Sequence, residues 1–148
     1  MNLKKILSPS VIFPSIEVTT KEDAIESMVK LLAAARDAGP IEPLLEVVME
    51  RERKDSTGLE QGIAVPHGKT DAVTDLIAGI GRLVEPVEWG TRDGSLVRIL
   101  VMTISPLKRT GPHLQFIGEV VRLLREERHR TSLLSASGAS EMYDVMTQ

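Results

Sequence analysis

The feature that most constrains the fold is an eight-residue run, 97–104, in which only Arg98 and Thr103 are polar. Apolar side chains follow one another there without the alternation of a half-exposed strand, and Ser105-Pro106 ends the run. Such a strand is typical of the centre of a sheet whose two faces are both covered. We therefore expect helices on both sides of it.

Apolar residues recur at helical spacing in several segments, which predicts the helices that cover the sheet. Thr19 and Glu22 form a candidate capping box for the first of them. Gly39-Pro40 ends this first helix, and Pro43 falls in the first turn of the second, where proline is tolerated. The expected helices cover about residues 20–37, 41–53, 113–125, 131–134 and 140–146.

Further short segments have the pattern of strands. Residues 63–65 form one strand, which Pro66 ends, and residues 76–83 form another. Residues 88–91 and 97–104 flank an Arg-Asp-Gly turn signal and are expected to pair as a hairpin. The order of helices, then strands, then helices predicts an α/β fold, a single-domain sandwich in which helices flank a mixed β-sheet on both sides.

Composition agrees with this fold class and excludes several functions. With 42% apolar and 26% charged residues, the chain can bury a core as one domain, residues 1–148. The absence of cysteine excludes a disulfide framework, a cysteine-based zinc site and a catalytic thiol. A net charge of −3 argues against a nucleic-acid partner. No apolar run approaches the roughly 20 residues of a membrane helix, so we expect a cytoplasmic protein without membrane insertion.

Three histidines are candidates for chemistry. His67 lies between Pro66, which fixes its own φ, and Gly68, which permits close approach, so its imidazole is expected on a stiff support at a strand end. On local sequence alone, an inert loop histidine is an equally good interpretation. His113 begins a helix, whose N-terminal field favours an anion such as a phosphoryl group, although an ordinary helix residue explains it too. His129 lies in a charged stretch and is expected to be a solvated surface residue.

Cations and hydroxyls gather at the end of the second expected helix. Arg51, Arg53 and Lys54 have an ordinary explanation in the helix dipole, but one guanidinium can also clamp phosphoryl oxygens with its planar fork. Ser56 and Thr57 follow at once, either to shape a turn or to bond a phosphoryl group or the histidine ring.

Other chemistries lack their sequence signals. The chain has no glycine-rich nucleotide loop, no Gly-x-Ser-x-Gly element and no closely spaced pair of histidines typical of zinc. A metal site built from His67, Asp71 and His113 is a minor alternative. We expect neither a metal nor a cofactor.

A longer pattern resembles a known family. The enzyme IIA domains of the fructose, mannitol and nitrogen-regulatory class (EIIA type-2) belong to the bacterial phosphoenolpyruvate-dependent phosphotransferase system. Their signature is similar to this chain at Arg51-Glu52, Ser56 to Leu59 and Gly62 to Lys69, and farther on at Trp89, Asp93-Gly94, 97–104 and His113-Leu114.

The resemblance implies a role for each candidate residue. It makes His67 the phosphoryl acceptor, Arg51 the active-site arginine and His113 the second active-site histidine, with Ser56 and Thr57 lining the pocket. The stretch after the arginine–glutamate pair is more charged than usual, so Arg53 competes with Arg51 for the clamping role.

The resemblance also implies partners. The donor would be a small phosphocarrier similar to HPr, and the acceptor an enzyme IIB-like component or a regulatory target. A first alternative is a regulatory module of the same fold that acts through protein partners without phosphotransfer to a sugar pathway. A second alternative is a binding module in which His67 is inert.

Overall fold

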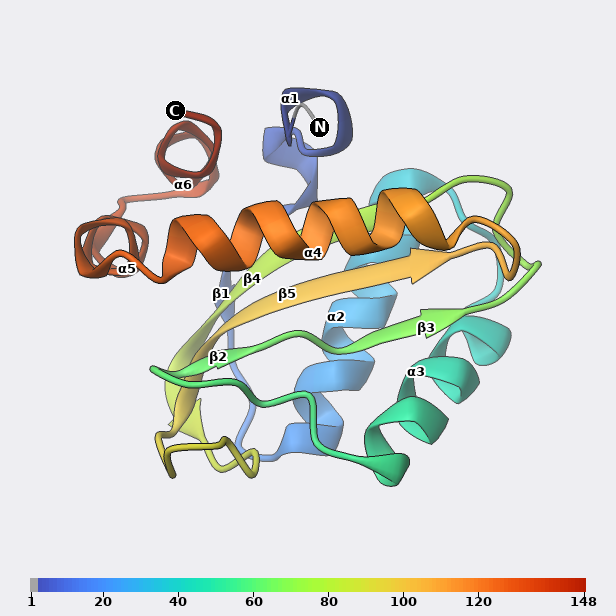
Figure 1. Ribbon diagram of the computed structural model, residues 1–148, viewed down its shortest axis with the longest axis horizontal. Helices are drawn as coiled ribbons and strands as arrows, with labels where there is room; N and C mark the ends of the chain where they lie inside the picture. The colour runs from blue at the N-terminus through green and yellow to red at the C-terminus, as the bar shows by residue number, and fades with distance from the viewer. Residues whose placement is uncertain (1–2) are drawn as a thin grey trace.

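Five strands form one mixed sheet between helical layers in residues 3–148, the part of the chain that the computed structural model describes (Figure 1). Residues 1 and 2 of the expected domain lie outside it. The strands are β1 (Ile12–Ile16), β2 (Ile63–Ala64), β3 (His67–Lys69), β4 (Ile77–Val87) and β5 (Val97–Ser105). Their order is β1-β4-β5-β2, and β3 also pairs with β5. β4 and β5 are antiparallel and the other pairs are parallel, which confirms the predicted mixed sheet.

The apolar run lies where its pattern indicates. β5 has β4 on one side and both β2 and β3 on the other. Every residue of β5 except Arg98 is buried. The prediction of a central strand covered on both faces is therefore confirmed.

Helices supply the two covering layers (Figure 1). α2 and α3 cover one face of the sheet, and α4 covers the other, with α6 packed against β1. No helix within residues 3–148 is both long enough and apolar enough to cross a membrane. The helices are α1 (Leu3–Ile6), the 3-10 turn η1 (Pro9–Val11), α2 (Lys21–Arg36), α3 (Glu42–Lys54), α4 (Thr110–Leu124), α5 (Glu127–Ser135) and α6 (Ala139–Thr147).

Element ends differ from the expected ones. Thr20, not Thr19, caps α2, since its Oγ1 accepts a hydrogen bond from the N–H of Asp23 at 3.1 Å. α4 begins three residues earlier than expected, at Thr110, and α5 is longer than the predicted short helix. These shifts arise because helix ends depend on caps and tertiary contacts more than on apolar periodicity.

The predicted hairpin strand 88–91 is wrong. β4 instead continues through Pro86 to Val87, which pairs with Val97. A register shift between Arg82 and Val87 accommodates the proline, whose missing N–H breaks a regular ladder. The hairpin therefore joins β4 to β5 through residues 88–96.

Candidate active site

His67 begins β3, a strand that the sequence pattern misses because Pro66 interrupts it. Pairing with β5 resumes after the proline, and His67 lies opposite Thr103. Side chains alternate along a strand, and Gly68 faces α3 so closely that a Cβ there would lie 2.7 Å from Cγ2 of Val47. The side chain of His67 therefore points to the other face, toward α4.

The backbone fixes the tautomer of His67. Its Nδ1 lies 2.8 Å from the carbonyl oxygen of Val65. A carbonyl only accepts, so Nδ1 donates the proton and Nε2 retains its lone pair. Burial is the main cause of a His67 pKa below the ordinary 6.5. The hydrogen bond to the Val65 carbonyl raises this pKa, and the positive charges of Arg51 and Lys69 lower it. The ring is accordingly neutral near neutral pH.

His113 lies directly beside this ring. It occupies the first turn of α4 and is only 3% exposed. The two imidazole centroids are 5.1 Å apart, with planes tilted by 48°. Burial, together with the positive charge of a protonated His67 and of Lys69, lowers the pKa of His113 to about 4. Both rings are therefore uncharged near neutral pH.

Thr103 orients His113 and escaped the sequence reasoning. Its Oγ1 lies 2.8 Å from Nδ1 of His113, and the residue is fully buried. The available signal was a hydroxyl within an otherwise apolar central strand, because buried polar groups need partners.

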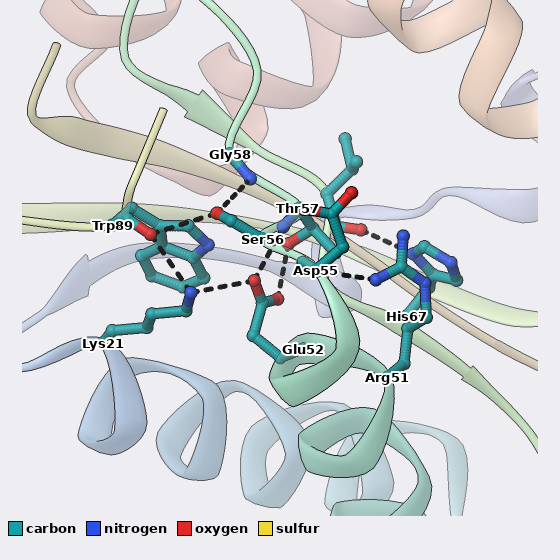
Figure 2. Close-up of polar contacts among 10 residues, drawn as sticks. Lys21, Arg51, Glu52, Asp55, Ser56, Thr57, Gly58, His67 and Trp89 are labelled. Atoms are coloured by element: carbon teal, nitrogen blue, oxygen red, sulfur yellow. Dashed lines mark hydrogen bonds and ion pairs between the residues drawn. The ribbon is translucent and has the colours of Figure 1, made fainter. Parts of the chain in front are cut away.

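Arg51 lines one open pocket with His67, near the end of α3 (Figure 2). Its Nη1 donates to the carbonyl oxygen of Asp55 at 2.7 Å. Arg53 is exposed and lies outside the lining of that pocket. The structure thus brings His67, His113 and Arg51 together, as the sequence predicts, and it combines a free ring nitrogen with a neighbouring cation.

Ser56 and Thr57 have protein partners. Thr57 donates its N–H to Oε2 of Glu52 at 2.7 Å and its hydroxyl to Oε1 at 2.5 Å. The hydroxyl of Ser56 donates to the carbonyl oxygen of Trp89 and accepts from the N–H of Gly58. Direct bonding of these hydroxyls to a phosphoryl group stays a prediction.

Glu52 and Lys21 have no role in the sequence analysis, although both are central to this loop (Figure 2). The side chain of Glu52 is 4% exposed, and the ammonium of Lys21 lies 2.9 Å from its Oε2. Lys21 also donates to the carbonyl oxygen of Trp89 at 3.1 Å. Glu52 was visible only as part of the signature, and no local pattern signals Lys21, because their meeting joins distant segments.

Metal binding has no support in this region. Among residues 3–148, no three His, Asp or Glu side chains lie close enough together to hold a metal ion. Asp71, the third member of the alternative metal site, accepts instead from the N–H of Leu107 at 3.2 Å. The three-ligand site considered above is therefore not formed.

Comparison with known proteins identifies the family. The model of the family described as phosphoenolpyruvate-dependent sugar phosphotransferase system, EIIA 2, matches residues 5–148. The chain belongs to this family. The resemblance read from the sequence is thereby confirmed, and with it a role in phosphotransfer at the level of the family.

Relatives include sugar-specific components and nitrogen regulatory proteins. A fructose-specific EIIA component of Haloferax volcanii is 32% identical over 129 residues, which cover 87% of this chain and 84% of that protein. A nitrogen regulatory protein of Bradyrhizobium diazoefficiens is 26% identical and covers 99% and 95%. The crystal structure of nitrogen regulatory protein IIA-Ntr from Neisseria meningitidis superposes with a TM-score of 0.90 at 30% identity, covering 98% and 99%.

Some relatives are much longer. The chain spans 23% of the fructose-specific EIIABC component of Bacillus subtilis, to which it is 29% identical. The match therefore concerns the IIA-like part of such multi-component proteins.

Proposed function

We propose that this chain is a phosphocarrier that accepts a phosphoryl group on Nε2 of His67. The donor is a phosphohistidine on a small carrier similar to HPr, and the acceptor is an enzyme IIB-like component or a regulatory target. The free lone pair of Nε2, in an open pocket beside Arg51, is the observation that carries this proposal.

The transfer exchanges one nitrogen–phosphorus bond for another. The lone pair of Nε2 attacks phosphorus, the bond to the donor's ring nitrogen breaks, and its electron pair returns to the donor ring. The donor ring leaves as neutral imidazole when its other nitrogen is protonated, and the proton on Nδ1 of His67 stays hydrogen-bonded to the Val65 carbonyl, which stabilises the positive charge of the phosphorylated ring. Both nitrogens belong to imidazoles, so little driving force is needed and catalysis reduces to positioning and charge stabilisation.

Two neighbours would assist this step. The guanidinium of Arg51 would neutralise phosphoryl oxygens as charge shifts in the transition state. If the hydroxyl of Thr103 donates to Nδ1 of His113, the Nε2–H of His113 is available to bond the same group. A neutral His67 is the nucleophilic form, which the lowered pKa of His67 favours at neutral pH.

The donor would dock on the surface around His67. Leu107 and Leu114 are 55% and 62% exposed; Leu107 lies in the loop before α4, and Leu114 directly follows His113 in the first turns of α4. Lys108 and Arg109 make the adjoining loop basic, which suits an acidic partner. Such an interface would be small and transient, because donor and acceptor must use it in turn.

Labelling tests the proposal directly. The protein is incubated with phosphoenolpyruvate, enzyme I and an HPr-like carrier, and intact mass spectrometry measures the gain of one acid-labile phosphoryl group. His67→Ala should abolish the gain because it removes the acceptor nitrogen. His129→Ala is the matched control and should label like the wild type, because His129 lies in α5 and contacts the C-terminal end of α4, whereas His113 lies in the first turn of α4. Full labelling of His67→Ala would show that another residue is the acceptor.

A regulatory role is a second candidate, in which the phosphoryl group is a signal. The nitrogen regulatory relatives favour it, among them the IIA-Ntr protein whose crystal structure superposes with a TM-score of 0.90 at 30% identity. In this role the phosphorylation state of His67 would decide which protein binds.

A further inference from the structure

We propose that Lys21, Glu52 and Thr57 are positioning residues. They hold the side chains of Arg51 and His67 in the relative position and orientation that phosphoryl transfer needs. The inference rests on the proposed function and adds three residues that act through Arg51 and His67, by way of their own hydrogen bonds and ion pair. They belong to three segments: the start of α2, the last turn of α3 and the loop that follows it (Figure 2).

Glu52 is the centre of the arrangement. Its buried carboxylate accepts three donors: the N–H of Thr57 (2.7 Å), the hydroxyl of Thr57 (2.5 Å) and the ammonium of Lys21 (2.9 Å). Charge-assisted bonds of this kind are short and directional. They leave residue 57 little freedom relative to α3.

Thr57 joins this carboxylate to the nucleophile. Its carbonyl oxygen accepts the N–H of Val65 at 3.1 Å, and the carbonyl of the same Val65 accepts Nδ1 of His67. The peptide at Thr57 is therefore two hydrogen bonds away from the ring whose Nε2 would react.

The same loop holds Arg51. The guanidinium donates to the carbonyl oxygen of Asp55, two residues before Thr57. The bonds between Thr57 and Glu52 also restrict the backbone at Asp55. They thereby fix the carbonyl that accepts the hydrogen bond from Arg51 and orients its guanidinium. The contacts that lead to Arg51 and the hydrogen bonds that lead to His67 thus both begin at Thr57.

Lys21 couples the arrangement to a second loop. Its ammonium donates to the carbonyl of Trp89 and lies 5.5 Å from the centroid of the indole ring. Ser56 donates to the same carbonyl at 3.0 Å. The loop after α3 is therefore bonded to Glu52 of α3 and to Trp89 of the loop between β4 and β5, and Lys21 of α2 bonds both of these residues.

Stability alone is a poor explanation for a buried ion pair here. Removing two charges from water costs several kcal/mol per ion, and apolar replacements of similar size often stabilise a protein equally well. What such a cluster does provide is a fixed geometry, and misplacement by about 1 Å can slow a reaction about 100-fold.

The first test removes one hydroxyl. Thr57→Val keeps the backbone bonds of residue 57 and the ion pair, but it loses the bond to Oε1 of Glu52. We expect kcat for transfer from the phosphorylated carrier to fall about 10-fold, with KM for the carrier within about twofold, because geometry and not docking is affected. Thr57→Ser restores the hydroxyl and should restore kcat. Thr131→Val, at an exposed threonine of α5, is the matched control.

A double-mutant cycle separates positioning from a general loss of stability. Because Thr57 is linked to both Arg51 and His67, Thr57→Val should slow the Arg51→Ala variant only about threefold, through the route to His67 that remains, although it slows the wild type about 10-fold. Arg53→Ala is the matched background, in which the full effect of Thr57→Val should remain. Equal effects in all backgrounds would overturn the coupling to Arg51.

The melting temperature of each variant shows whether a loss of activity arises simply from unfolding. If Thr57→Val is unfolded at the assay temperature, Lys21→Met takes its place, because it removes the cation and leaves the two bonds between Thr57 and Glu52. A fall in kcat of at least about threefold at unchanged KM supports the inference, and unchanged kcat overturns it.

The wild type distinguishes the two levels of the proposal. No labelling of the folded wild type by the phosphorylated carrier overturns the proposed function and this inference with it. Normal labelling of the wild type, with Thr57→Val as fast as Thr131→Val, overturns this inference alone.

Discussion

At the scale of single residues, the burial of His113 makes it sensitive to acid. Its pKa is about 4 in the folded protein, against an ordinary value of 6.5. As the pH falls below 6.5, the unfolded chain therefore takes up a proton that the folded chain does not accept until about pH 4. The stability that neutral His113 contributes is complete above 6.5 and is lost through this window.

His113→Gln tests this assignment. The glutamine cannot be protonated, so its free energy of unfolding should fall less than that of the wild type between pH 6.5 and about pH 4. Chemical denaturation across this range measures the difference. The variant should also accept a phosphoryl group, more slowly than the wild type, because it retains His67. Equal acid sensitivity of the two proteins would contradict the pKa assignment, and complete loss of labelling would contradict the helper role.

At the scale of elements, the approach of α3 to β3 sets the distance between Arg51 and His67. Gly68 makes this approach possible, because a Cβ there would lie 2.7 Å from Cγ2 of Val47 and 3.0 Å from the backbone N of Val48. The backbone atoms of a helix cannot give way as a side chain can. A larger residue at this position must therefore push the strand and the helix apart.

Gly68→Ala is expected to destabilise the protein by about 1–3 kcal/mol, which is typical of overpacking. It should also slow phosphoryl transfer, since α3 moves with Arg51. Gly118→Ala is the matched control, because Gly118 lies in α4 with nothing within 4 Å of the added Cβ, and alanine favours a helix. Urea unfolding measures both variants. A Gly68→Ala variant as stable as Gly118→Ala would show that α3 and β3 tolerate separation.

At the scale of the whole molecule, a phosphoryl group would change the charge of one face. The chain carries a net charge of −3, and phosphorylation adds about 1.5 to 2 negative charges. In the regulatory role, a partner that docks around His67 should distinguish the two forms. Pull-downs with the phosphorylated and unphosphorylated protein should recover different proteins, and His67→Ala should behave as the unphosphorylated form throughout. The same proteins on both forms would contradict the regulatory role.

Much of the architecture was open to prediction because it depends on local pattern. Apolar spacing located α2, α3 and α4, and an uninterrupted apolar run located β5 at the centre of the sheet. β3 was missed because three residues after a proline carry no periodic signal. The hairpin strand was misplaced because the turn signal alone indicates where two strands are joined and not how far each extends, and β4 continues through Pro86 to Val87 with a register shift.

The sequence by itself determined the fold class and, through its resemblance to a family signature, predicted His67, His113 and Arg51 as site residues. Only the tertiary structure decided that Thr103 orients His113, that Nε2 of His67 is the free nitrogen, and that Lys21 reaches Glu52. The physical reason is one of range. Periodicity records whether a side chain is buried, but hydrogen bonds between segments dozens of residues apart depend on which buried groups the packed layers bring within about 3 Å.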